Sequence, residues 1–251
     1  MAGLKDRFID FCREYPGAEE IDSIPLSDEQ KVLKLKKADF FFENRTIICE
    51  IKALETETEN KAVEFMRAHG LDPAGLSAGQ HVVEELFQTL PKGQNLYNDL
   101  VKLVTKPVEA GFDSAALQIP DTKRLFNIAS ADGLLVMLND SVTMASAPFI
   151  VERLSLAVRK KDANGQPYHR EVTHILHIGE SYYVETANGN KSVDVTLPNP
   201  TTNEKHGVEA FARKLVTDWA AYNGQPLEDA GTEIKDLMSK SKLFVEVIKS
   251  K

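Results

Sequence analysis

Residues 37–53 read Lys-Ala-Asp-Phe-Phe-Phe-Glu-Asn-Arg-Thr-Ile-Ile-Cys-Glu-Ile-Lys-Ala, and this stretch decides the predicted fold. The apolar and β-branched run from Thr46 to Leu54 predicts a buried strand, and Phe40 to Phe42 predicts a second strand beside it. The polar residues between the two runs indicate a turn. We therefore expect a β-hairpin at this point of the chain.

Three charged side chains interrupt the hairpin: Asp39, Glu50 and Lys52. Side chains alternate across a strand, so Glu50 and Lys52 share one face. If Asn44-Arg45 is a two-residue turn, Asp39 lies opposite Glu50, with the two Cβ atoms roughly 4.5 to 5.5 Å apart. A three-residue turn would shift the register by one residue and separate the two acids.

Two facing carboxylates repel each other, and burial makes the repulsion costly unless a cation compensates it. Oxygen ligands of this kind suit Mg²⁺ or Mn²⁺ better than zinc, which prefers nitrogen and sulfur. Lys52 could orient a metal-activated water or stabilise the negative charge that develops on a phosphate during attack. The pattern thus favours hydrolysis of a phosphodiester, whereas a simple Glu50–Lys52 ion pair on a half-exposed strand is the structural alternative.

Asp39, ten intervening residues and Glu50-Ile51-Lys52 on a strand resemble the signature of the PD-(D/E)xK nuclease superfamily. This resemblance implies that Asp39 and Glu50 bind the metal, that Ile51 lends its backbone carbonyl and that Lys52 is the catalytic lysine. Ala38 replaces the proline that often precedes the first aspartate. The implied partner is nucleic acid, with DNA favoured over RNA because the family mostly acts on DNA. A binding or assembly protein that keeps the fold without catalysis is the alternative function.

The resemblance implies further polar residues at such a site. The helix before the first core strand often supplies another acid, and Glu14, Glu19 and Glu20 remain open for that role. Many members also project polar side chains from the helix that follows the Glu-x-Lys strand. Those candidates are Gln118, Lys123 and Arg124.

The order of predicted elements indicates an α/β fold with a restriction-endonuclease-like core, a mixed central sheet and flanking helices. For the core, at 1–145, we expect a helix at 4–14, a strand at 31–36, the hairpin, a helix at 112–129 that Pro120 would kink, and a buried strand at 134–138. Helices at about 55–105 would form an insertion. Residues 146–251 would form a β-rich extension with C-terminal helices, packed on the core as one globular unit.

Within the extension we expect an extended element at 148–161 and strands at 169–179 and 181–187, with a turn at 188–189. A helix around 208–219 would bury Trp219, and a charged helix would follow at 228–240. Of the three histidines, His174 would face opposite to His169 and His177. We interpret all three as ordinary strand residues and not as metal ligands.

Composition narrows the function classes. The 251 residues carry a net charge of −8, which argues against a protein that coats nucleic acid with a broad basic surface. Two local basic runs remain, Lys31 to Lys37 and Arg159 to Lys161. With two cysteines, Cys12 and Cys49, we expect neither a disulfide framework nor a zinc site. No signal peptide or membrane-length apolar run is evident, so a cytoplasmic location without membrane contact is expected, and homodimerisation stays open.

Overall fold

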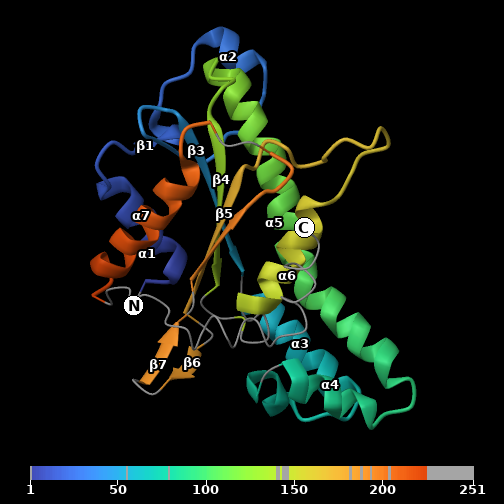
Figure 1. Ribbon diagram of the computed structural model, residues 1–251. Helices are drawn as coiled ribbons and strands as arrows, with labels where there is room; N and C mark the ends of the chain where they lie inside the picture. The colour runs from blue at the N-terminus through green and yellow to red at the C-terminus, as the bar shows by residue number, and fades with distance from the viewer. Residues whose placement is uncertain are drawn as a thin grey trace.

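The computed structural model describes residues 2–54, 56–78, 80–139, 142, 147–180, 183–186, 189–192, 194–202 and 205–224. Its centre is a six-stranded mixed sheet in the order β1-β2-β3-β4-β5-β8 (Figure 1). β3, β4 and β5 are parallel, whereas β1, β2 and β8 run antiparallel to their neighbours. The strands are β1 (Glu19–Glu20), β2 (Phe40–Phe42), β3 (Ile47–Leu54), β4 (Asp132–Asn139), β5 (His174–Gly179) and β8 (Val195–Pro198). The chain is therefore an α/β protein, as predicted.

Helices cover both faces of the sheet. α1 (Leu4–Glu14) and α7 (Val208–Tyr222) lie on one face, and α5 (Gly93–Phe126) and α6 (Ala147–Val158) lie on the other (Figure 1). The remaining elements are η1 (Ile21–Ser23), α2 (Asp28–Val32), α3 (Thr56–Ala68), η2 (Pro73–Ala78), α4 (Gln80–Gln88) and the ribbon of β6 (Tyr183–Thr186) and β7 (Gly189–Ser192). Within the described part of the chain, no helix is long and apolar enough to cross a membrane.

The sheet separates two apolar cores. On the α1 and α7 face, the Trp219 ring lies 5.2 Å from that of Phe8 and 5.5 Å from that of Phe11, measured between ring centroids. Trp219 is 2% exposed, so its predicted role as a core anchor is confirmed. On the opposite face, Phe112 of α5 and Met137 of β4 lie in the second core. All eight residues of β4 are buried, as expected of a strand covered on both sides.

The hairpin forms with the predicted register. Phe42 pairs with Ile47 and Phe40 with Cys49, and Asn44 and Arg45 have positive φ values of 53° and 67°, as two-residue hairpin turns require. The ladder ends at Phe40, however. The Asp39 amide donates to the Cys49 carbonyl at 3.0 Å, so Asp39 is not a ladder partner of Glu50.

Neighbouring contacts explain why the chain leaves the ladder at Asp39. The Asp39 carbonyl accepts from Ile21 at 2.9 Å, and the buried Ala38 amide donates to Thr122 Oγ1 of α5 at 2.8 Å. These two bonds tie residues 38 and 39 to α5 and to η1, respectively. The Asp39 side chain nevertheless stays next to β3, where its Oδ2 accepts from the Ile51 amide.

The predicted strand at 31–36 is wrong. Residues 28–32 form α2, whose start has a complete capping box between Ser27 and Gln30. Lys34 then has a φ of 50°, which turns the chain, and residues 34–38 have no regular structure. The short alternation of apolar residues and lysines misled the prediction, because Val32 and Leu33 are exposed and no strand pairs with them. The first core strand is instead the two-residue β1.

Two further helical predictions need correction. The last helix of the expected insertion at 55–105 and the helix expected at 112–129 are one continuous helix, α5, which contains both Pro107 and Pro120. The expected insertion boundary at 105 therefore falls inside a helix.

Residues 147–158 form α6 and not an extended element, since Ile150, Leu154 and Ala157 follow helical spacing into the core. The strand expected to begin at residue 169 begins at His174, and the turn at 188 and the helix at 228–240 lie outside the described residues.

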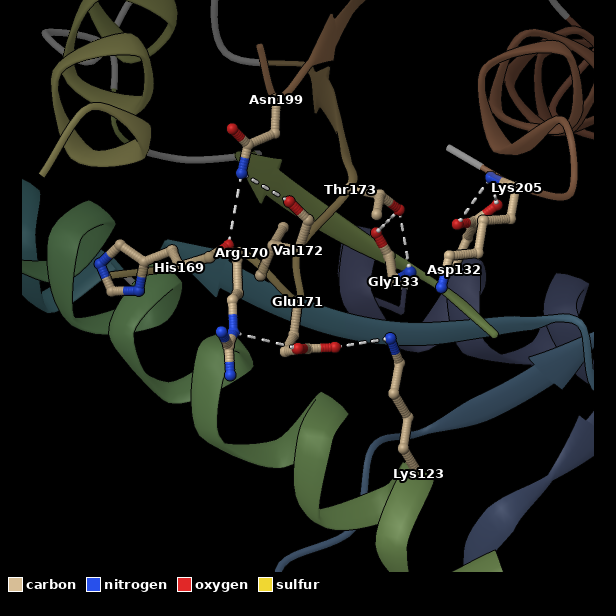
Figure 2. A network of polar contacts seen from close by, with 10 residues as sticks. All are labelled: Lys123, Asp132, Gly133, His169, Arg170, Glu171, Val172, Thr173, Asn199 and Lys205. Atoms are coloured by element: carbon tan, nitrogen blue, oxygen red, sulfur yellow. Dashed lines mark hydrogen bonds and ion pairs between the residues drawn. The ribbon is translucent and has the colours of Figure 1, made fainter. Parts of the chain in front are cut away.

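A polar network holds the loop before β5 against the sheet (Figure 2). Thr173 Oγ1 bonds both the amide and the carbonyl of Gly133, each at 2.9 Å, and Lys123 of α5 pairs with Glu171 at 2.8 Å. Gly133 needs to be glycine because a Cβ there would lie 2.1 Å from the Glu171 carbonyl oxygen. Through this network α5, β4 and β5 are fixed relative to one another.

Candidate active site

Asp39, Glu50 and Lys52 meet on the α5 face of the sheet. Ile48, which shares its face with Glu50 and Lys52, belongs to the α5 core, whereas Cys49 and Ile51 belong to the opposite core. The predicted sharing of a face is therefore confirmed. Glu50 is 1% exposed, but Asp39 is only partly buried and the Lys52 side chain is 26% exposed. The site thus has one deeply buried acid and two groups that solvent can reach.

Lys52 is held from two sides. Its Nζ lies 2.6 Å from Glu50 Oε1 and donates to Gln118 Oε1 at 2.9 Å. Gln118 in turn donates through Nε2 to the Lys37 carbonyl at 2.7 Å and accepts from Ser114 Oγ at 2.6 Å. Gln118 therefore links Lys52 to the segment that leads into Asp39. Of the polar residues considered on this helix, Gln118 is the one that the structure brings to Lys52.

Close packing between α5 and β3 makes this contact possible. A Cβ on Gly111 would lie 3.4 Å from both Cβ and Cγ of Lys52 and 3.2 Å from Met137 Cε. A larger residue at position 111 would therefore push against the stem of the lysine. Sequence reasoning missed Gly111, although a glycine in the middle of an apolar helical pattern is a signal for close approach.

The two carboxyl groups share an unfavourable environment. Burial and the nearby Asp39 charge together raise the pKa of Glu50 to about 7, against the opposing effect of Lys52. Burial also raises the pKa of Asp39, although the Ile51 amide donates to Asp39 Oδ2 at 2.6 Å and lowers it. Glu50 Oε2 is buried without a hydrogen-bond partner. An unsatisfied buried carboxylate oxygen beside a second acid is costly unless a cation binds there.

These donors fit a hard divalent cation. Glu50 Oε2 has a free lone pair, and one oxygen of Asp39 remains beside the one that the Ile51 amide occupies. Mg²⁺ is typically held by one or two carboxylates and keeps several waters or substrate oxygens. Among the residues that the structure describes, no group of three or more His, Cys, Asp or Glu side chains is arranged to hold a metal. Asp39 and Glu50 are thus the two carboxylates that could hold such a cation.

The other acids proposed for the site lie elsewhere. Glu19 pairs with Arg45 and Glu20 with Arg13 at 2.8 Å, while Glu14 is exposed on α1. These pairs fix Arg45 and Arg13 near β1. None of the three joins Asp39 and Glu50.

The basic helix candidates also lie elsewhere. Lys123 is bound to Glu171, and the Arg124 side chain is 69% exposed beside Asp121. Position on the helix explains the difference from Gln118. Gln118 lies at the level of Lys52, whereas Thr122, one helical turn further along α5, lies at the level of Ala38.

The histidines do not form a cluster. His174 and His177 face opposite sides of β5, as alternation predicts, and burial lowers the pKa of each to about 4. His169 lies in the loop before β5 and not on a strand, with Nε2 3.0 Å from Asp113 Oδ1. Cys12 and Cys49 are both buried and free. The two cysteines belong to the core on the α1 and α7 face, where burial and the Asp39 charge raise the pKa of both thiols.

No family model, no curated protein and no solved structure matches the chain. The function of the chain is therefore inferred from the geometry of the site.

Proposed function

We propose that this chain is a metal-dependent nuclease with a restriction-endonuclease-like core, and that it hydrolyses phosphodiester bonds in nucleic acid, with DNA favoured over RNA. The observation that carries the proposal is the meeting of Asp39, Glu50 and Lys52 on one face, with Glu50 Oε2 buried and unsatisfied. The element order α1, β1, β2, β3, α5, β4 supports the fold assignment, with α3 to α4 inserted after β3.

In the proposed site Asp39 and Glu50 would hold Mg²⁺ or Mn²⁺, with the Ile51 carbonyl as a further ligand. A bound cation of this kind supplies Lewis-acid activation of water and of the phosphate. Lys52 presents an ammonium that stabilises negative charge on a phosphate oxygen. Gln118 and Glu50 fix the position of Lys52 Nζ, and the partial exposure of Lys52 allows a substrate to reach it.

The test is incubation of the purified protein with plasmid, single-stranded DNA and RNA in Mg²⁺, Mn²⁺ and EDTA. We expect metal-dependent cutting that is lost, by at least a hundredfold, in Lys52→Ala and Asp39→Asn proteins that keep the wild-type melting temperature. Lys102→Ala, which removes an exposed lysine of α5, is the matched control and should cut normally. Equal cutting by Lys52→Ala and wild type would reject the assignment.

The alternative is a binding or assembly protein with the same core. The double engagement of Lys52 by Glu50 and Gln118 favours it, because a lysine held in this way can serve as a structural ion pair. A thermal shift separates the two functions. Mn²⁺ should raise the melting temperature of the wild type but not of Glu50→Gln if the metal site exists, and no shift together with no cutting would favour the binding protein.

A further inference from the structure

The segment from α2 to the candidate site forms a basic projection, which we call the lysine arm and define as residues 31–37. It contains Lys31, Lys34, Lys36 and Lys37 and no acid, in a chain whose net charge is −8. α2 lies at one end of the molecule, beside the carboxyl end of α5 (Figure 1). Such a run of positive charge stands out against the acidic remainder.

The arm has an apolar tip. Val32 is 77% exposed and Leu33 is 51% exposed, and both lie directly between lysines. These side chains suit a partner that offers negative charge and an apolar surface together, as a nucleic acid does with its phosphates and its sugars and bases.

The arm is fixed to α5 by hydrogen bonds of the Gln30 side chain and the Lys36 backbone, and these bonds engage none of its ammonium groups. Gln30 Nε2 donates to the Leu125 carbonyl at 2.7 Å, and the Lys36 amide donates to Asp121 Oδ2 at 3.2 Å. Lys31 and Lys37 are paired with Asp28 and Asp22, respectively, but no ion pair within the described residues engages Lys34 or Lys36. Val32 and Leu33 are therefore exposed to solvent on a segment that is hydrogen-bonded to α5.

The arm is continuous with the candidate site. The Lys37 carbonyl accepts from Gln118, which also binds Lys52, and Asp39 follows two residues later. Seven residue steps separate Val32 from Asp39, so the tip lies at most about 25 Å from the site. One turn of duplex DNA is about 34 Å long, so one bound duplex can reach both.

The second basic run does not offer the same surface. Lys160 lies 3.7 Å from Glu109, and the acid Asp113 lies on the same stretch of α5 beside His169. That run is thus partly paired, as residues 31–37 are through Lys31 and Lys37. Position separates the two runs, because residues 31–37 lead directly into Asp39, and this continuity favours them as the nucleic-acid contact.

We propose that the lysine arm binds the backbone of a DNA duplex, with Lys34 and Lys36 contacting phosphates and Val32 and Leu33 contacting sugars or bases. The proposal rests on the proposed nuclease function for its substrate class. Duplex binding can be measured without cleavage, so the binding role of the arm and the nuclease function can be tested separately.

The experiment is fluorescence anisotropy of a labelled 30-base-pair duplex in EDTA, across a salt series. Counterion release from two phosphates should make the Lys34→Gln/Lys36→Gln protein bind at least tenfold more weakly at 0.15 M salt, with a salt slope smaller by about two. Val32→Ser/Leu33→Ser should weaken binding with an unchanged slope. The matched control is Lys92→Gln/Lys102→Gln, which removes the same charge about 35 Å or more along α5 from Leu125 and should bind as the wild type does.

Three results would overturn the proposal. The first is wild-type binding that the arm variants leave unchanged, which would keep the nuclease function but remove the arm from it. The second is no duplex binding by the wild type. The third is arm-dependent binding to vesicles of phosphatidylserine and phosphatidylcholine in place of DNA. Absence of cutting together with arm-dependent duplex binding would instead retain this inference and reject the nuclease.

Discussion

The Glu50 carboxyl group lies in the interior beside a second acid, and one of its oxygens has no partner. Its neighbours shift its pKa in opposite directions. Lys52 stabilises the charged form, whereas burial and Asp39 stabilise the protonated form, and the result is a pKa of about 7. Such an acid is a natural place for a metal, because a divalent cation removes both the repulsion and the unsatisfied oxygen.

This pKa predicts how stability depends on pH in EDTA. The folded pKa of about 7 exceeds the ordinary value of 4.5, so the native state holds a proton that the unfolded state releases. The free energy of unfolding should therefore fall as pH rises from about 4.5 to about 7, by at most about 3 kcal/mol. Glu50→Gln should remove most of this fall. Urea denaturation at a series of pH values measures it.

Glu14→Gln is the control for that series, because Glu14 is an exposed acid. Its stability should follow the wild-type curve at every pH. An unchanged fall in Glu50→Gln would show that another group titrates. Asp39 would then be the first to examine, since burial also raises its pKa.

At the residue scale, much of the site was predictable. Alternation along β3 placed Glu50 and Lys52 together, and the two-residue turn fixed the register up to Phe40. The departure at Asp39 was not predictable, because it depends on bonds to Ile21 and Thr122 from distant segments. The choice of Gln118 over Lys123 likewise depends on where α5 crosses β3.

At the scale of the element, α5 decides the shape of the site. It supplies Gln118 to Lys52 and Ser114 to Gln118, and it approaches β3 closely at Gly111. It also anchors residues 36–38 through Asp121 and Thr122. A change in how this helix packs should therefore alter the site before it unfolds the protein.

Gly111→Val should test this dependence. The added methyl groups would contact the Lys52 stem and Met137, so we expect cleavage to fall at least tenfold while the melting temperature falls by only a few degrees. Gly111→Ala should be milder, because the helix propensity of alanine offsets part of the crowding. Activity and thermal denaturation are measured on the same samples.

Ala110→Val is the matched control for that pair, since Ala110 is exposed on the same helix. Its activity should equal that of the wild type. If Gly111→Val also cut normally, close approach at position 111 would have no part in holding Lys52.

The misassigned elements also have a physical explanation at this scale. Prolines normally limit helices, yet α5 continues through Pro107 and Pro120 because its packing outweighs the lost backbone bonds. Residues 154, 156 and 158 alternate as in a strand, but Leu156 is 50% exposed and Leu154 and Val158 lie one helical turn apart. Short apolar patterns fit both periods, and only tertiary contacts decide between them.

At the scale of the whole molecule, the sheet crosses the boundary expected near residue 145. β5 and β8 extend the same sheet beyond β4, and α7 covers the face that includes Leu134 and Val136. The amino-terminal residues 1–145 therefore lack two strands of the sheet, β5 and β8, and the helix α7 that covers it.

We expect a fragment of residues 1–145 not to fold. It would expose the edge of β4 and the apolar face that Val208, Phe211 and Leu215 normally cover. The fragment should show no cooperative thermal transition in near-ultraviolet circular dichroism, whereas the full chain should show one. A cooperative transition in the fragment would mean that the amino-terminal part is an independent domain.

The pairing of β3 with β4 also bears on synthesis of the protein. Ile47 pairs with Asp132, 85 residues later, so the hairpin leaves the ribosome long before its central neighbour exists. At 5 to 20 residues per second the delay is roughly 4 to 17 s. During that interval the strand that carries Glu50 has an open edge, and pairings between segments so distant fold slowly. We therefore expect the nascent chain to bind chaperones that shield exposed strands.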